Sequence, residues 1–144
     1  MKSRILAVGK VRGAQAALCD EYIKRLTGGF SVRELATQNQ KAENEAILAA
    51  LPAQSFVVIL DEHGQDLTSR ELAHKMAAWQ DQGVSELVLV IGGADGLTAA
   101  VKERADFCLS LGHKTWPHQL ARVMLIEQLY RAQQINNGHP YHRD

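Results

Sequence analysis

The chain has 144 residues, 46% of them hydrophobic and 22% charged, and its 16 basic and 16 acidic residues cancel to a net charge of zero. This length suits one domain with its own core, and the composition excludes a disordered or fibrous protein. The charge balance argues against a nucleic-acid binder that works by bulk attraction to phosphate. No apolar run approaches the roughly 20 residues that span a bilayer, no signal peptide is recognisable, and Cys19 and Cys108 form no C-x-x-C pattern. We therefore expect a soluble, cytoplasmic, single-domain protein with reduced thiols.

Strands and helices are predicted to alternate along the chain. Five short runs rich in β-forming residues predict strands at 4–8, 30–35, 56–60, 87–91 and 107–111. The third and fourth runs are continuously apolar, which is typical of central strands covered on both faces. Helical patterns lie between the strands, and Thr68 with Glu71 predicts a capping box at the start of the third helix. The alternation predicts an α/β fold with a mostly parallel sheet flanked by helices.

The last predicted helix, from Gln119 to about Asn136, has apolar residues around most of its circumference. A helix with a single core-facing stripe would be narrower. Two explanations stay open at this point: burial within the monomer, or one face in the core and another against a second subunit.

A glycine-rich segment, Gly92-Gly93-Ala94-Asp95-Gly96, follows the fourth strand. It is neither a G-x-G-x-x-G motif nor a phosphate-binding P-loop. It can be a tight strand-to-helix connection, or a loop that lets a ligand approach the backbone at the carboxyl end of a parallel sheet.

Asp61 follows the third strand, which is where a phospho-accepting receiver domain has an acidic residue. Such a domain also needs an acidic pair after the first strand, and Gly9-Lys10 occupies that place here. We therefore interpret Asp61 as a turn residue.

The C-terminal segment is unusual for a chain end, because Tyr141, His142 and Arg143 follow Pro140. These side chains suit gripping or polarising an anionic, planar substrate, although a docked structural tail is the other interpretation. His139 and His142 have no obvious third partner and Pro140 separates them, so we expect no metal site.

Several spaced motifs in the last 55 residues resemble one family. They are Val90-Ile91-Gly92-Gly93-Ala94-Asp95-Gly96-Leu97, Leu109-Ser110-Leu111, Pro117-His118, Arg122 with Glu127-Gln128-Leu129-Tyr130-Arg131-Ala132, and His139-Pro140-Tyr141-His142-Arg143. In this order they resemble the RlmH-type SPOUT methyltransferases, bacterial enzymes that methylate N3 of a pseudouridine in 23S ribosomal RNA. The resemblance extends over the whole length, including Ile5-Leu6-Ala7-Val8-Gly9-Lys10.

The resemblance implies one SPOUT domain over residues 1–144, with a C-terminal trefoil knot, working as a homodimer on the assembled ribosome. It also implies S-adenosylmethionine as co-substrate and no metal. The positions that match the cofactor loops are Leu60, Gly92, Leu111, Gly112, His113, Lys114, Thr115 and Trp116. Departures occur at residues 112–114, which are less apolar than usual in the family, and at Trp116, where leucine is usual. Both change the walls that the resemblance implies for the adenine pocket.

The resemblance implies that catalytic groups lie at His118 and in the tail, at His139, Tyr141, His142 and Arg143, in a site completed by the other subunit. N3 of pseudouridine must lose its proton or have its developing anion stabilised, and histidine and arginine can do this. No single general base stands out. Two alternatives remain: a SPOUT-type methyltransferase for another rRNA or tRNA site, told apart by which RNA accepts methyl, and a non-enzymatic ribosome-associated binding module, which would not bind S-adenosylmethionine.

Overall fold

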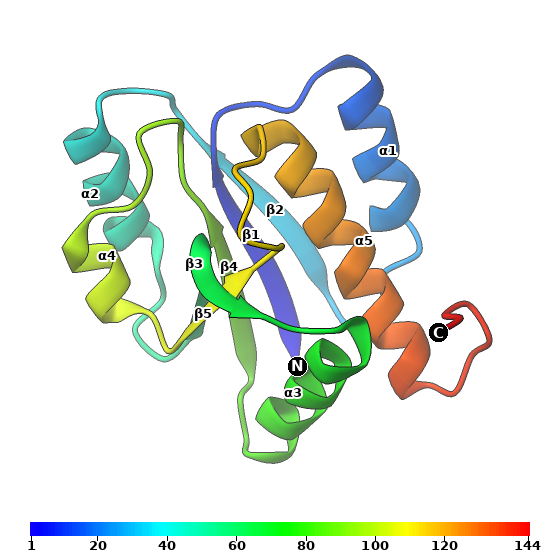
Figure 1. Ribbon diagram of the computed structural model, residues 1–144. Coiled ribbons are helices and arrows are strands. Elements are labelled where there is room, and N and C mark those ends of the chain that lie inside the picture. Colours follow the sequence, from blue (N-terminus) through cyan, green and yellow to red (C-terminus); the bar gives the residue numbers. More distant parts are fainter.

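Five parallel strands form one sheet, with helices on both faces, in the computed structural model, which describes residues 1–144 (Figure 1). The spatial order of the strands is β2-β1-β4-β3-β5. The elements in chain order are β1 (Lys2–Val8), α1 (Gly13–Ile23), β2 (Phe30–Leu35), α2 (Gln40–Ala50), β3 (Phe56–Asp66), α3 (Ser69–Asp81), β4 (Glu86–Ile91), α4 (Ala99–Arg104), β5 (Phe107–Ser110) and α5 (His118–Asn136). The predicted α/β class and parallel sheet are confirmed. No helix combines the length and apolar character that crossing a bilayer requires.

Two hydrophobic layers hold the helices to the sheet. Helices α1, α3 and α5 cover one face, and α2 and α4 cover the other (Figure 1). Successive residues of a strand point to opposite faces. Thus Ile5 packs in the layer under α5, whereas Leu6 packs in the layer with Ile47 of α2. The prediction of central strands is confirmed, because β4 and β3 both have neighbours on either side.

Helix ends follow the local sequence. The hydroxyl of Thr68 accepts a hydrogen bond from the backbone N–H of Glu71 at 3.1 Å, as the capping box predicts. Gly83 follows the end of α3 with φ of +93°, a conformation that favours glycine. Helix α5 packs against both α1 and α3, so the monomer itself buries much of the wide apolar surface noted in the sequence.

Strand β3 is longer than predicted. We expected it to end at Leu60, yet it continues to Asp66, with a register shift against β5 between Leu60 and Gln65. Residues 61–64 therefore form an excursion from the regular ladder. Gly64 permits it, because a Cβ atom there would lie 2.7 Å from the carbonyl oxygen of Cys108. Asp61 is in this excursion, where its carboxylate accepts a hydrogen bond from the N–H of His63 at 2.8 Å.

Smaller differences concern other boundaries. Strand β1 begins at Lys2 and β4 at Glu86, while β5 ends at Ser110 rather than at residue 111. These shifts of one or two residues are the usual uncertainty of element ends. The trefoil knot that the resemblance implies stays a prediction.

Candidate functional site

A cavity of about 760 Å³ lies at the carboxyl ends of β3 and β4. Three chain segments form most of its wall: residues 60–63 of β3, residues 91–97 from the end of β4 onward, and residues 111–118 from the end of β5 to the start of α5, without residue 113. Carboxyl ends of parallel strands meet at one edge of a sheet, which is where ligands bind in such folds. The topology thus brings together segments that are up to 58 residues apart in the chain (60 to 118).

Seven of the eight predicted cofactor positions line this cavity: Leu60, Gly92, Leu111, Gly112, Lys114, Thr115 and Trp116. The eighth, His113, lies outside the wall. Its Nδ1 is 2.8 Å from the carbonyl oxygen of Glu62, and because a carbonyl only accepts, Nδ1 carries the donated proton. His113 therefore fastens the loop before α5 to the excursion of β3.

Glu62 makes a second contact with the same loop. The hydroxyl of Thr115 donates to the carboxylate of Glu62 at 2.5 Å, so side chain and backbone of one residue both hold this wall. The indole N–H of Trp116 donates to the carbonyl oxygen of Leu111 at 3.0 Å, and the Trp116 residue remains 41% exposed. Sequence reasoning missed Glu62, because the strand was expected to end before it.

Hydrogen bonds with side chains of α2 fix the glycine-rich loop after β4. The buried amide of Asn44 donates to the carbonyl of Gly96 at 3.2 Å and accepts from the N–H of Thr98 at 2.9 Å. Gln40 donates to the carbonyl of Asp95 at 2.8 Å. These contacts leave little freedom to the loop. The signal in the sequence is a polar residue, Asn44, beside the apolar stripe of the second helix.

Close packing leaves no room for a side chain at Gly92 or Gly93 of this loop. A Cβ at Gly92 would lie 2.8 Å from Cδ2 of Leu97, and one at Gly93 would lie 2.5 Å from a carboxylate oxygen of Glu43. The resemblance implies that Gly92 gives a ligand access to the backbone, and this stays a prediction. A larger residue at 92 would also displace Leu97, which itself lines the cavity.

His118 connects the cavity to a neighbouring polar hollow of about 460 Å³ beside Arg12 and Gln15. One turn further along α5, the buried Arg122 donates to the carbonyl of Gly9 at 2.9 Å and forms an ion pair with Glu34. Burial opposes ionisation of Glu34, but hydrogen bonds from Arg122 and from the backbone of Val11 outweigh it and lower its pKa. Arg122 thus fixes the segment after β1 opposite His118.

The C-terminal tail lies elsewhere, against the C-terminal half of α5. The hydroxyl of Tyr141 donates to Glu127 at 3.0 Å, and its ring packs against Tyr130 with the centroids 4.8 Å apart. The guanidinium of Arg131 lies 4.8 Å from the centre of the Tyr141 ring. Burial, followed by the hydrogen bond with Glu127, raises the pKa of Tyr141 well above its ordinary value. Tyr141 therefore stays protonated near neutral pH.

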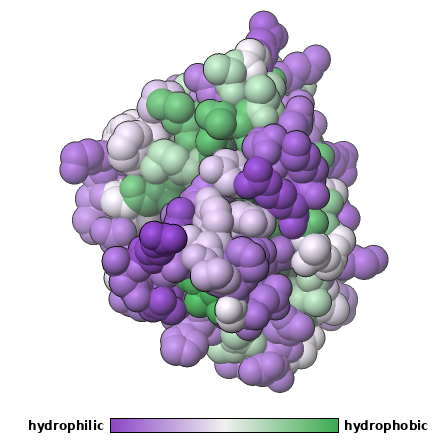
Figure 2. Space-filling view, turned by 90° about the vertical axis from the view of Figure 1, so that its right-hand side faces the viewer, coloured by the Kyte–Doolittle hydropathy of each residue, from purple (hydrophilic) through white to green (hydrophobic).

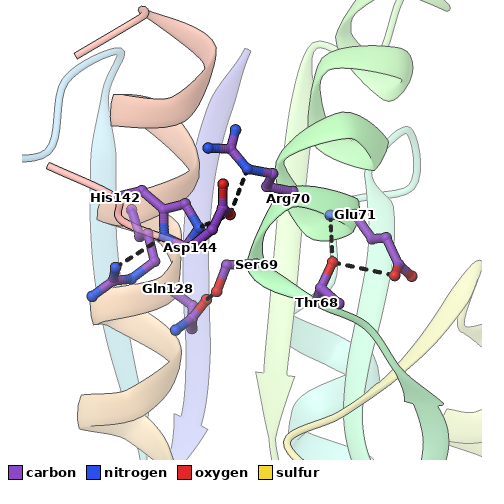
Figure 3. Close-up of polar contacts among 8 residues, drawn as sticks. Thr68, Ser69, Arg70, Glu71, Gln128, His142 and Asp144 are labelled. Carbon is purple, nitrogen blue, oxygen red and sulfur yellow. Dashed lines mark hydrogen bonds and ion pairs between the residues drawn. The ribbon is translucent and has the colours of Figure 1, made fainter. Parts of the chain in front are cut away.

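The last residues link the tail to a second helix (Figure 3). Nδ1 of His142 is 3.1 Å from a guanidinium nitrogen of Arg131, and Nε2 is 3.0 Å from the carboxylate of Asp144. The same carboxylate oxygen accepts from Arg70 of α3 at 2.7 Å, and this bond lowers the pKa of Asp144. His139 and Arg143 are exposed.

One protomer does not bring the tail residues into the cavity. Of the five predicted catalytic residues, only His118 lines it. The cavity reaches Ala121 of α5, whereas Tyr141 contacts Glu127, which lies six residues or about 9 Å further along the helix. A groove of about 480 Å³ lies between the cavity and Tyr141, because its wall includes both Leu111 of the cavity and Glu127.

On the face that carries α1 and α5, apolar surface gathers in the upper half, with hydrophilic surface around it (Figure 2).

No group of three or more metal-ligating side chains comes together in the structure.

The fold and this cavity define a class that the sequence comparisons identify. A family model described as "Predicted SPOUT methyltransferase" matches residues 1–142, and the chain belongs to this family. Among curated relatives, proteins called ribosomal RNA large subunit methyltransferase H are 44% identical in Rhodospirillum centenum, 46% in Paramagnetospirillum magneticum and 47% in Rhodospirillum rubrum. Each alignment covers 99% of both chains.

Solved structures agree on the fold. A probable methylase family protein from Haemophilus influenzae has a TM-score of 0.60 at 12% identity, covering 99% of this chain and 70% of that one. A probable methyltransferase from Bordetella pertussis has a TM-score of 0.58 at 14% identity, covering 91% and 95% of the two chains.

Membership of the family implies an S-adenosylmethionine co-substrate. The cavity fits such a molecule in volume and chemistry, because it combines apolar side chains with exposed main chain at several glycines. At Gly112 and Gly96 a Cβ atom would meet nothing within 4 Å, so both leave open space beside the backbone.

Proposed function

We propose that this chain transfers a methyl group from S-adenosylmethionine to N3 of a pseudouridine in 23S ribosomal RNA of the assembled ribosome. The observation that carries the proposal is the cavity of three loops at the carboxyl edge of the sheet, in a chain that matches the SPOUT family over residues 1–142. Relatives named as ribosomal RNA large subunit methyltransferase H, aligned over 99% of both chains, support the choice of substrate.

The co-substrate supplies an activated methyl group, so the protein's task there is binding and orientation. Leu60, Leu111 and Trp116 are the apolar groups of the wall suited to an adenine ring. The backbone of the glycine-rich loop and of Gly112 offers polar atoms to the rest of the molecule. The contacts of Glu62 and Asn44 hold these walls in place before the ligand arrives.

We propose a homodimer in which the tail of one copy completes the cavity of the other. Two observations support this: the tail and the cavity lie apart in one protomer, and Leu18, Trp116 and Leu120 remain 48%, 41% and 40% exposed. Apolar surface that gathers on one face, as it does on the face of α1 and α5 (Figure 2), is typical of protein interfaces. His118 at the cavity, together with Arg143 from the second copy, would then flank the reacting base.

The protein's net charge of zero is compatible with an RNA substrate, because we propose that it recognises the shape of a preassembled particle in the cytoplasm. Such recognition does not depend on bulk attraction to phosphate. A few well-placed cations, such as Arg143, then suffice for contacts with RNA.

The test is methyl transfer from labelled S-adenosylmethionine to three acceptors: assembled ribosomes that lack the modification, free 23S RNA and transfer RNA. We expect transfer to the ribosomes, with ribosomes that already carry the modification as the matched control. Transfer to tRNA or to another rRNA position would replace the proposed substrate. Absence of S-adenosylmethionine binding in calorimetry would instead favour a ribosome-associated binding module.

A further inference from the structure

The final residue of the chain joins the tail to α3. One carboxylate oxygen of Asp144 accepts a hydrogen bond from Nε of Arg70 at 2.7 Å and also contacts Nε2 of His142 at 3.0 Å (Figure 3). On its other side, the His142 ring meets Arg131 of α5. A histidine that is only slightly exposed, with a side-chain exposure of 13%, therefore lies between two helices.

The partners of His142 determine where its proton is. An arginine has only donors, so the Nδ1 atom that faces Arg131 must be the acceptor. The single proton of the neutral ring is then on Nε2, where it is donated to Asp144. Both ring nitrogens are engaged, and in this arrangement neither can take a proton from a substrate.

Tyr141 is engaged in the same way, because its hydroxyl proton is donated to Glu127. Arg143 lies between His142 and Asp144 in the chain, is exposed, and makes no hydrogen bond or ion pair with the rest of the protein. The side chains of Tyr141, His142 and Asp144 thus anchor the tail, and Arg143 is the side chain presented outward.

We propose that Arg70 is a positioning residue for methyl transfer, which holds Asp144, and through it His142, so that the tail presents Arg143 to the substrate. This inference rests on the proposed function. It assigns His142 and Tyr141 to anchoring the tail and leaves proton removal from N3 to another group.

The Arg70–Asp144 pair has little to contribute to the fold itself. Its side chains are 54% and 69% exposed, and exposed ion pairs contribute little to stability. What the pair does restrict is the set of conformations open to the tail. Its effect is therefore expected on the rate of transfer rather than on the melting temperature.

The experiment is single-turnover methylation of ribosomes by wild type, Arg70→Ala, Asp144→Asn and the double variant. We expect each single variant to lose about twofold to fivefold in maximal rate, with the affinities for S-adenosylmethionine and ribosomes unchanged. The double variant should lose no more than either single one, because both act through one contact. Arg70→Lys, which keeps a cation beside Asp144, should restore most of the rate. The matched control is Arg33→Ala, which removes an exposed arginine of β2 that makes no ion pair.

A second readout needs no activity. Ring ¹⁵N chemical shifts of His142, assigned by difference with His142→Gln, should show a bare Nδ1 and a protonated Nε2 in wild type, and a mixture of tautomers in Arg70→Ala. Wild-type rates in Arg70→Ala, additive losses in the double variant, or an unchanged tautomer would overturn the inference. If wild-type protein transfers no methyl to ribosomes but the tautomer responds to Arg70→Ala, the anchoring stands and the proposed function fails.

Discussion

The cavity at the carboxyl edge of the sheet and the C-terminal tail are built in opposite ways. Main-chain segments after three parallel strands form the cavity, and α2 holds its glycine-rich loop by hydrogen bonds to backbone atoms. The tail has no regular secondary structure, and the side chains of Glu127, Arg131 and Arg70 hold it. A cavity of this kind depends on topology and on residue size, whereas such a tail depends on single charges.

Because of this difference, we expect different kinds of substitution to affect the cavity and the tail. In the cavity, volume changes should alter ligand affinity, and changes of polar side chains away from the loop contacts should be tolerated. In the tail, the loss of one charged group should alter the rate and leave ligand affinity intact. Ligand affinity and the rate of methyl transfer therefore distinguish the two regions.

The largest effect is expected from deletion of Pro140–Asp144. The cavity contains none of these residues, so S-adenosylmethionine binding and dimerisation should be kept. Methyl transfer to ribosomes should fall by at least about 100-fold, because the deletion removes Arg143 and its anchors together. Single-turnover assays and calorimetry on the same preparation measure both quantities. Unchanged transfer would show that the tail is not part of the site, and a protein that no longer folds would show that the tail is a structural element.

Arg143→Ala measures how much the single side chain of Arg143 contributes to the rate of methyl transfer. If its guanidinium stabilises the anion that develops at N3, we expect a loss of about 100-fold in rate, comparable with removal of an oxyanion donor. Arg143→Lys should recover only part of it, because an ammonium lacks the planar fork of donors. The measurement is made at two salt concentrations. A loss that shrinks at low salt would assign Arg143 to a phosphate contact instead.

Gly92→Ala adds one methyl group beside the cavity and tests whether this change in volume lowers the affinity for S-adenosylmethionine. The added Cβ would lie 2.8 Å from Leu97, so that side chain must move, and we expect S-adenosylmethionine to bind about tenfold more weakly. Gly92→Val should abolish binding while the circular dichroism spectrum stays that of a folded protein. The double variant Gly92→Ala with Leu97→Ala removes the clash and should recover affinity, which calorimetry can measure. For wild type, ligand at about 100 times its dissociation constant should stabilise the fold by about 2.7 kcal/mol in a thermal-shift titration. Equal affinity in wild type and Gly92→Ala would show that this packing does not shape the site.

The smallest effect is expected from pH acting on Tyr141. Its pKa in the folded protein is raised above the ordinary value of 10.0, first by burial and then by the bond to Glu127. The protonated hydroxyl therefore favours the docked tail at every pH below about 10, and this contribution is lost as pH rises through the raised pKa. The difference in phenolate absorbance between wild type and Tyr141→Phe should show one tyrosine that ionises well above pH 10. A midpoint at the ordinary value would mean that the hydroxyl is not buried against Glu127.

Much of the cavity could be predicted from the sequence because its parts follow local rules. Continuous apolar runs indicated the central strands, and a glycine-rich loop after the fourth strand indicated a ligand site at the carboxyl edge. The excursion of β3 could not be predicted, because it depends on the close approach of Gly64 to Cys108 across the sheet. All eight expected cofactor positions, seven of which line the cavity, came from the family resemblance and not from periodicity.

The sequence left a docked tail open as one interpretation, but it did not indicate which contacts hold the tail. Arg70 and Asp144 are 74 residues apart, and neither belongs to a motif. Their contact depends on the packing of α3 beside α5, which pattern analysis does not give. Composition alone indicated that Tyr141, His142 and Arg143 were unusual, but it did not separate the residues that anchor the tail from the residue that is presented outward.

The most direct test of the central claim is a map of base methylation in ribosomal RNA from a strain that lacks this protein, with and without its restoration. We expect one N3-methylated pseudouridine of 23S RNA to be missing in the deletion strain. Wild-type protein should restore it, and the variant without Pro140–Asp144 should not. An unchanged methylation map in the deletion strain would contradict the proposed function, and a methyl group missing from a different RNA would contradict the proposed substrate.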